Sequence, residues 1–219
     1  MSRLHVRTFL SGAFAQNGYI VEEEGATFAV AVDPGADSGA MADYLADNGL
    51  FCEAILLTHA HLDHVEGIAD LVARTGAATW MHPDDRPLYD HVQQQAAAFG
   101  LEVRPQPPID HTLAHGQTLR FGGIALEVRH VPGHSPGHVL FYNAEGGFAL
   151  VGDIVFAGSI GRTDLPGGDM STLLRGIRAH VLTLPDQTVL YPGHGPATSV
   201  ERERIGNPFL SPAFGGKLA

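Results

Sequence analysis

The first half of the chain alternates short apolar runs with longer segments in which apolar residues recur every three or four positions. The short runs predict β-strands, and the helical spacing predicts amphipathic helices. Beyond a first strand within residues 1–15, we predict strands at 19–23, 27–32, 54–57 and 79–81. The predicted helices span 39–48, with Ser38 as the cap, 65–74 and 84–99.

The second half repeats this order, with strands first and helices after them. The predicted strands are 119–121, 124–130, 139–143, 148–151 and 189–191, and the predicted helices are 171–182 and one that begins near Ser199. Two such halves predict an α/β protein in which two sheets pack face to face with helices outside. No change in composition marks a linker, so we expect a single domain over residues 1–219.

Composition narrows the functional class. The chain has 13 Lys and Arg against 24 Asp and Glu, a net charge of −11, which argues against nucleic-acid binding. No apolar run approaches the roughly 18 to 20 residues of a membrane-spanning helix. Thr8, Ser11 and Gly12 interrupt the N-terminal apolar stretch, so we expect no signal peptide and a cytoplasmic protein. The single cysteine, Cys52, excludes a disulfide framework.

Histidine is the unusual residue, with 13 copies, and the densest group follows a buried strand in the order His59-Ala-His61-Leu-Asp63-His64. Residues two apart on extended chain face the same side, so His59 and His61 can converge on one ion. The chain then turns, which directs Asp63 and His64 toward a neighbouring point. This motif is expected by chance in only about three of a thousand chains of this composition, so it is a specific signal for a metal site.

Three further candidate ligands each follow a strand end beside a glycine. They are His134 in Pro-Gly-His, Asp153 after Gly152, and His194 in Pro-Gly-His-Gly. Glycine lets the backbone approach an ion closely. Seven ligands are too many for one tetrahedral zinc and suit two divalent ions that share a bridging carboxylate. Zinc is the first candidate, with iron and manganese as alternatives, because all three accept imidazole and carboxylate ligands.

These motifs resemble those of the metallo-β-lactamase-fold hydrolases, and within them the short, single-domain bacterial type of the glyoxalase II-like (hydroxyacylglutathione hydrolase) group. The resemblance extends from Asn17 and Asp33-Pro34-Gly35 to Asn207-Pro208-Phe209. It implies an αββα sandwich of two mixed sheets without a separate C-terminal helical domain. It also implies one ion held by His59, His61 and His134, a second held by Asp63, His64 and His194, and Asp153 as the bridge.

The resemblance further implies the reaction. A hydroxide that bridges the two metals would hydrolyse a thioester, S-lactoylglutathione or a related small-molecule acyl-thiol, in a monomer or homodimer. Asp63 would act catalytically by orienting the hydroxide and taking its proton. Arg162 occupies the position of a cation that anchors the thiol carrier; alternatively it forms a salt bridge with Asp164 or Asp169 that fixes its own loop. Asp33 would accept a hydrogen bond from a metal-binding histidine and so orient it, beyond its role in the turn.

An oxidoreductase is the alternative function. The mononuclear iron persulfide dioxygenases share this fold, act on glutathione persulfide and would use only His59, His134 and Asp153 for iron. They commonly replace the glycine found here at position 193, so Gly193 favours the hydrolase. Of the other histidines, His82 and His130 are expected to be structural, and His138 is expected to lie near the site.

Overall fold

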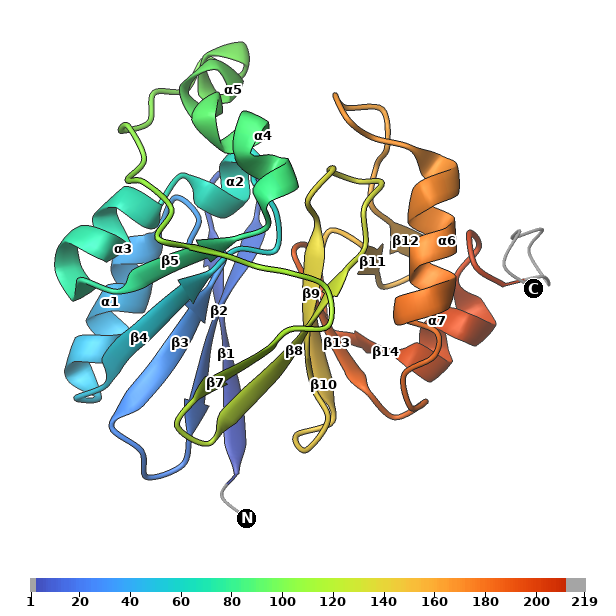
Figure 1. Cartoon of the computed structure of the whole chain (residues 1–219), viewed down its shortest axis with the longest axis horizontal. Helices are drawn as coiled ribbons and strands as arrows, with labels where there is room; N and C mark the ends of the chain where they lie inside the picture. The colour runs from blue at the N-terminus through green and yellow to red at the C-terminus, as the bar shows by residue number, and fades with distance from the viewer. Residues whose placement is uncertain (1–2, 212–219) are drawn as a thin grey trace.

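The computed structural model describes residues 3–211, and its centre consists of two mixed six-stranded sheets stacked face to face (Figure 1). The first sheet has the order β1 (Leu4–Ser11), β2 (Gln16–Glu23), β3 (Phe28–Val32), β4 (Phe51–Leu56), β5 (Ala78–Met81) and β6 (His111–Thr112). The second has the order β14 (Thr198–Ser199), β13 (Val189–Pro192), β10 (Phe148–Gly152), β9 (Val139–Asn143), β8 (Ile124–His130) and β7 (Thr118–Phe121). The predicted α/β sandwich is confirmed.

The helices lie on the outer faces of the two sheets (Figure 1). The first sheet carries α1 (Ser38–Asp47), α2 (Leu62–Val65), α3 (Ile68–Thr75), the 3₁₀ turn η1 (Pro83–Asp85), α4 (Arg86–Asp90) and α5 (Val92–Ala98). The second carries α6 (Met170–His180) and α7 (Val200–Gly206), and a short hairpin of β11 (Val155–Phe156) and β12 (Ser159–Ile160) lies nearby. None of the helices in residues 3–211 is long and apolar enough to cross a bilayer.

The apolar core has three layers because both faces of each sheet are covered. Adjacent residues of β2 show the alternation: Ile20 packs against the helices, and the next residue, Val21, packs between the sheets. Phe141 of β9 belongs to the same layer between the sheets as Val21, and Ile177 of α6 belongs to the layer on the outer face of the second sheet. Strands buried on both faces are continuously apolar, which explains why short apolar runs predicted them so well.

Two predicted helices are interrupted, and both breaks matter for the site. The helix predicted at 65–74 begins only at Ile68, as α3, and a separate turn, α2, ends at Val65, because Gly67 donates its N–H to the Pro34 carbonyl and its backbone lies against Gly35. The segment predicted at 84–99 divides into η1, α4 and α5, with a break at His91. The prediction of Ser38 as a helix cap is wrong: Ser38 is the first residue of α1, and Asp37 occupies the cap position, with no hydrogen bond from its side chain to the first turn of the helix.

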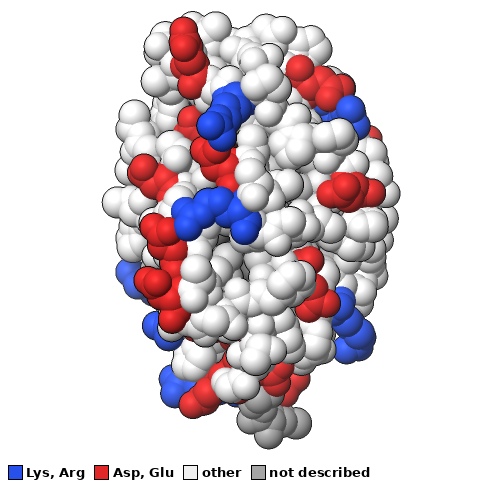
Figure 2. Space-filling view, turned by 90° about the vertical axis from the view of Figure 1, so that its left-hand side faces the viewer, with Lys and Arg blue, Asp and Glu red and all other residues white. Residues whose placement is uncertain are grey.

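Charged side chains on the side of the molecule nearest α1 and α3 are interspersed rather than gathered by sign (Figure 2). Asp43 of α1 forms an ion pair with Arg74 of α3, and Asp70 of α3 forms one with Arg104. Paired charges of this kind leave no continuous cationic surface on that face.

Candidate metal centre

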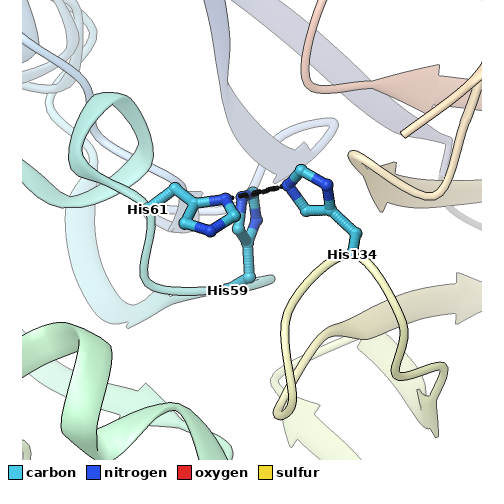
Figure 3. Close-up of side chains that lie close together, drawn as sticks. All are labelled: His59, His61 and His134. Atoms are coloured by element: carbon cyan, nitrogen blue, oxygen red, sulfur yellow. Dashed lines mark hydrogen bonds between the residues drawn. The ribbon is translucent and has the colours of Figure 1, made fainter. Parts of the chain in front are cut away.

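Three buried histidines from two loops meet at one end of the sandwich, and we call them the histidine trio: His59, His61 and His134 (Figure 3). His59 and His61 follow β4, and His134 follows β8. The Nδ1 atom of His61 lies 2.8 Å from Nε2 of His134, which in turn lies 3.3 Å from Nε2 of His59. Three ring nitrogens at this spacing could hold one metal ion.

A second cluster, which we call the mixed group, contains Asp63, His64 and His194. The Oδ2 atom of Asp63 lies 3.1 Å from Nε2 of His194 and 3.8 Å from Nε2 of His64. Asp63 and His64 belong to α2, whereas His194 follows β13 of the other sheet. This cluster therefore joins the two halves of the chain and could hold a second ion.

Asp153, which follows β10, lies between the two clusters. Its Oδ1 is 3.3 Å from Nε2 of His64, and its Oδ2 is 3.5 Å from Nε2 of both His134 and His194. One carboxylate thus reaches both the histidine trio and the mixed group, which is the arrangement that a bridging ligand requires.

The outer ring nitrogens of three of these histidines are held by oxygen acceptors, which fixes the orientation of those rings. The Nδ1 atoms of His134 and His194 lie 2.7 and 3.1 Å from the carbonyl oxygens of Arg162 and Phe14. The Nδ1 atom of His64 lies 3.0 Å from a carboxylate oxygen of Asp33. Because these oxygens only accept, each Nδ1 donates, so each of these rings in its neutral form presents the Nε2 lone pair to the centre.

Two buried atoms in the centre support the presence of metal ions in the functional protein. Nε2 of His64 and Oδ1 of Asp153 have no hydrogen-bond partner among the described residues. Buried polar atoms without partners are costly, and coordination to a cation would satisfy both. The donor set, imidazole nitrogen with carboxylate oxygen, fits zinc, iron or manganese.

The two clusters differ in how their surroundings shift the pKa values of their side chains. Burial lowers the pKa of all three histidines in the trio, that of His61 to about 3, so they are neutral, the form that binds metal. In the mixed group, burial alone would lower the pKa of His64, but the Asp153 and Asp63 carboxylates raise it well above its ordinary value. Burial would likewise raise the pKa of Asp153, and the surrounding imidazoles, His64 first, hold it low.

Asp85 holds the two loops of the histidine trio together. This fully buried carboxylate accepts hydrogen bonds from the Ala60 N–H at 2.9 Å, the Ser135 hydroxyl at 2.8 Å and the Gly137 N–H at 2.5 Å. Ala60 lies between His59 and His61, and Ser135 follows His134. One side chain therefore sets the spacing between the two loops that supply the trio.

The turn that carries His194 is held from the first sheet. The Asn17 side chain donates to the carbonyls of Pro192 and Gly195 at 3.0 and 2.8 Å. The Tyr19 hydroxyl donates to the Pro192 carbonyl at 2.5 Å. The hairpin of β1 and β2 thereby brings a residue of the second sheet to the mixed group.

Residues 11–194 match the sequence profile of the metallo-beta-lactamase superfamily. The chain belongs to this superfamily. The match spans most of the chain and contains all seven candidate ligands, which confirms the resemblance drawn from the motifs.

Individual members of the superfamily are similar over nearly the whole chain. Hydroxyacylglutathione hydrolase GloC of Haemophilus influenzae is 36% identical over 206 residues, which cover 91% of this chain and 94% of that protein. The structure of TTHA1623 in a di-iron-bound form is 41% identical, with a TM-score of 0.85 and coverage of 94% and 100%. The BLEG-1 B3 metallo-beta-lactamase is 34% identical, with a TM-score of 0.88 and coverage of 94% and 99%.

The seven side chains singled out in the sequence all lie together in this superfamily member. The Asp33 carboxylate contacts His64 Nδ1 and accepts hydrogen bonds from the Thr58 N–H and hydroxyl at 2.7 and 2.6 Å. Arg162 contributes its backbone carbonyl to His134, while its guanidinium pairs with Asp164 at 2.7 and 2.8 Å. The expected alternative partner Asp169 instead caps α6.

The remaining histidines occupy different places. His138 lies beside the centre, where its Nε2 accepts the Asp153 N–H at 3.0 Å and its ring stacks on His59 at 4.5 Å. His82 and His130 stack on each other at 4.0 Å, apart from the seven candidate ligands. Asp84 lies close to both histidines. The lone pairs of an imidazole lie in the plane of its ring, so two nearly parallel, stacked rings cannot both direct a lone pair to one ion. His82, Asp84 and His130 therefore do not form a further metal centre.

Asp85 and Tyr19 were not singled out in the sequence, although both position the centre. Each acts on backbone groups of a loop far away in the chain, and no local spacing reveals such a contact. The only available signal was the acidic pair Asp84-Asp85 in a segment predicted as a regular helix.

Proposed function

We propose that the protein is a metal-dependent hydrolase of small-molecule acyl-thiols, similar to glyoxalase II, with S-lactoylglutathione or a related thioester as substrate. The observation that carries this proposal is the joining of the histidine trio and the mixed group by Asp153 at the floor of a cavity. The similarity to hydroxyacylglutathione hydrolase GloC over most of both chains supports the thioester class.

The seven side chains would hold two divalent ions, zinc first, with iron or manganese as alternatives. When bound, such a pair polarises a carbonyl oxygen and lowers the pKa of water from 15.7 to about 7, which supplies a nucleophile at neutral pH. The di-iron form of TTHA1623 supports two ions in a centre of this kind and keeps iron among the candidates.

Asp63 is the residue we propose for proton transfer. It lines the cavity, and its pKa is below the ordinary value because the imidazoles of His64 and His194 outweigh the effect of burial. An ionised carboxylate at this position can orient the attacking water and accept its proton as the tetrahedral adduct forms.

Arg162 is the residue we propose for binding the thiol carrier. Its side chain is 61% exposed, lines the same cavity and forms a two-point ion pair with Asp164. The pair with Asp164 uses Nε and Nη2, which leaves Nη1 as the donor for a carboxylate of glutathione. The pair with Asp164 also fixes the loop, so the two roles suggested by the sequence are compatible.

The experiment is metal analysis of the purified chain, with thioester hydrolysis and oxygen consumption measured on the same sample. We expect about two metal ions per chain, hydrolysis of S-lactoylglutathione or another glutathione thioester, and no oxygen uptake. One iron per chain, with oxygen uptake on glutathione persulfide and no thioester cleavage, would instead establish the persulfide dioxygenase. We further propose a single-domain monomer or homodimer, which analytical ultracentrifugation of the same sample tests.

A further inference from the structure

The cavity beside the metal centre has an apolar wall that metal binding does not explain. Its volume is about 220 Å³, and besides the candidate ligands it is lined by Phe14, Leu62, Phe99, Leu165 and Arg162. Phe14 comes from the turn between β1 and β2, and Phe99 follows the last residue of α5. Side chains from distant segments therefore place two aromatic rings next to the catalytic atoms.

The two rings form one surface, which we call the aromatic wall: Phe14 and Phe99 meet edge to face with centroids 5.1 Å apart. The Phe14 backbone is fixed at the centre, because its carbonyl accepts from His194 Nδ1. The next residue, Ala15, has φ = +51°, a left-handed conformation that alanine adopts only at a cost. Such local strain often accompanies a functional constraint, here the direction of the turn that carries Phe14.

The exposure of Phe99 is a second observation that points to a ligand on the aromatic wall. Its side chain is 59% exposed, although it lies at the mouth of a cavity that contains Asp63 and His194. Other large apolar residues are exposed on the surface, but among those described Phe99 is the one that lines this cavity, and an apolar wall beside a few polar groups is typical of a ligand site. The aromatic wall is thus available to the apolar part of a substrate.

The size of the cavity indicates which part of the substrate the aromatic wall binds. Pockets that enclose a drug-sized ligand measure about 300–1,000 Å³, so this cavity holds one end of a thioester rather than the whole molecule. Arg162, a cation on a separate loop, suits the anionic thiol carrier. We propose that the aromatic wall binds the acyl group and selects acyl-thiols with an apolar alkyl or aryl acyl group over those with a small hydroxyacyl group. This inference rests on the proposed function and specifies its substrate class.

The test is the dependence of kcat/KM on acyl length, measured with S-acetyl-, S-butyryl- and S-hexanoylglutathione and with S-lactoylglutathione for comparison. Burial of each added methylene against the aromatic wall raises kcat/KM by about two- to fourfold. Phe99→Ala should flatten this dependence. Phe51→Ala is the matched control, because Phe51 is 62% exposed but belongs to β4 and lines no part of this cavity; it should keep the full dependence.

Each outcome decides a different point. A rise with acyl length that Phe99→Ala abolishes and Phe51→Ala retains establishes the aromatic wall as the acyl site. Equal kcat/KM values across the series in the unmodified protein, or a rise that survives Phe99→Ala, overturn the inference and leave the thioesterase intact. No turnover of any thioester by the fully metal-loaded protein overturns both the inference and the proposed function.

Discussion

The histidine trio and the mixed group lie side by side, yet they differ in charge and exposure. The trio consists of imidazoles that are buried and neutral, with lowered pKa values. The mixed group contains the Asp63 carboxylate and two histidines whose pKa values are raised, and its His194 side chain is 30% exposed. The same residue type therefore serves a closed binding position in one cluster and an open, charge-balanced position in the other.

The two clusters also have separate supports. Asp85 holds the loops of the trio through backbone N–H groups. Asp33 contacts the mixed group directly through His64. Asp33 also reaches the trio, because the Thr58 hydroxyl that donates to it lies 3.1 Å from His59 Nδ1. Its direct ring contact is with His64 alone, so changes in these three carboxylates should affect the two clusters unequally.

Asp153→Ala should have the largest effect, because it removes the candidate ligand whose carboxylate lies against both clusters. We expect at least one metal to be lost and turnover to fall by more than about 100-fold, beyond the range for residues that only support a ligand. Metal analysis and steady-state kinetics on the same preparation test this. Unchanged turnover would refute the bridging role.

Asp33→Asn should weaken the mixed group more than the trio, because Asp33 contacts His64 directly and reaches His59 only through the Thr58 hydroxyl. Asparagine tolerates the positive φ of +49° at this position, but its NH₂ group replaces a carboxylate oxygen that faces His64 Nδ1. We expect one of two metal-binding steps to weaken by about 10- to 100-fold, measured by chelator competition. Asp37→Asn, in which the carboxylate contacts only the exposed Gly12 N–H, is the control and should leave both steps unchanged.

Asp85→Asn should weaken the other metal-binding step, that of the histidine trio, by about tenfold. The loss is smaller because Asp85 contacts no ligand ring and only sets the spacing of the loops that carry the trio. Asp110→Asn is the matched control: Asp110 likewise accepts from a backbone N–H and a hydroxyl, both of Thr79, away from the ligand loops. The control should lose thermal stability without loss of metal affinity. If Asp33→Asn and Asp85→Asn weaken the same step, the division into two clusters is wrong.

Arg162→Ala should have the smallest effect. The backbone carbonyl that holds His134 remains, so both binding steps should be unchanged. Loss of an exposed guanidinium should raise KM for glutathione thioesters by about two- to fivefold, the range of an exposed ion pair. A changed metal content in this variant would show that the side chain supports the trio.

The cluster of candidate ligands was predictable because its signals are local. His59 and His61 share one face of extended chain, and His134 and His194 each follow a strand end beside glycine, so short stretches of sequence contain the geometry. Strands buried on both faces were equally clear: the segments predicted at 124–130 and 139–143 coincide with β8 and β9.

The residues that position the candidate ligands were not predictable, because they act between segments far apart in sequence. Asp85 reaches the loop amides from a 3₁₀ turn that the sequence presented as part of one long helix. The break at Gly67 follows from a backbone contact with Pro34, which apolar periodicity does not record. Two-residue strands such as β6 have no pattern at all to detect.

Anomalous diffraction from crystals of the metal-loaded protein tests the central claim most directly. We predict two peaks about 3.5–4 Å apart, one about 2.0–2.1 Å from the nitrogens of His59, His61 and His134 and the other within bonding distance of Asp63, His64 and His194, with Asp153 in contact with both. A single peak in crystals of fully loaded protein, or two peaks of which either lies outside these side chains, would contradict the account.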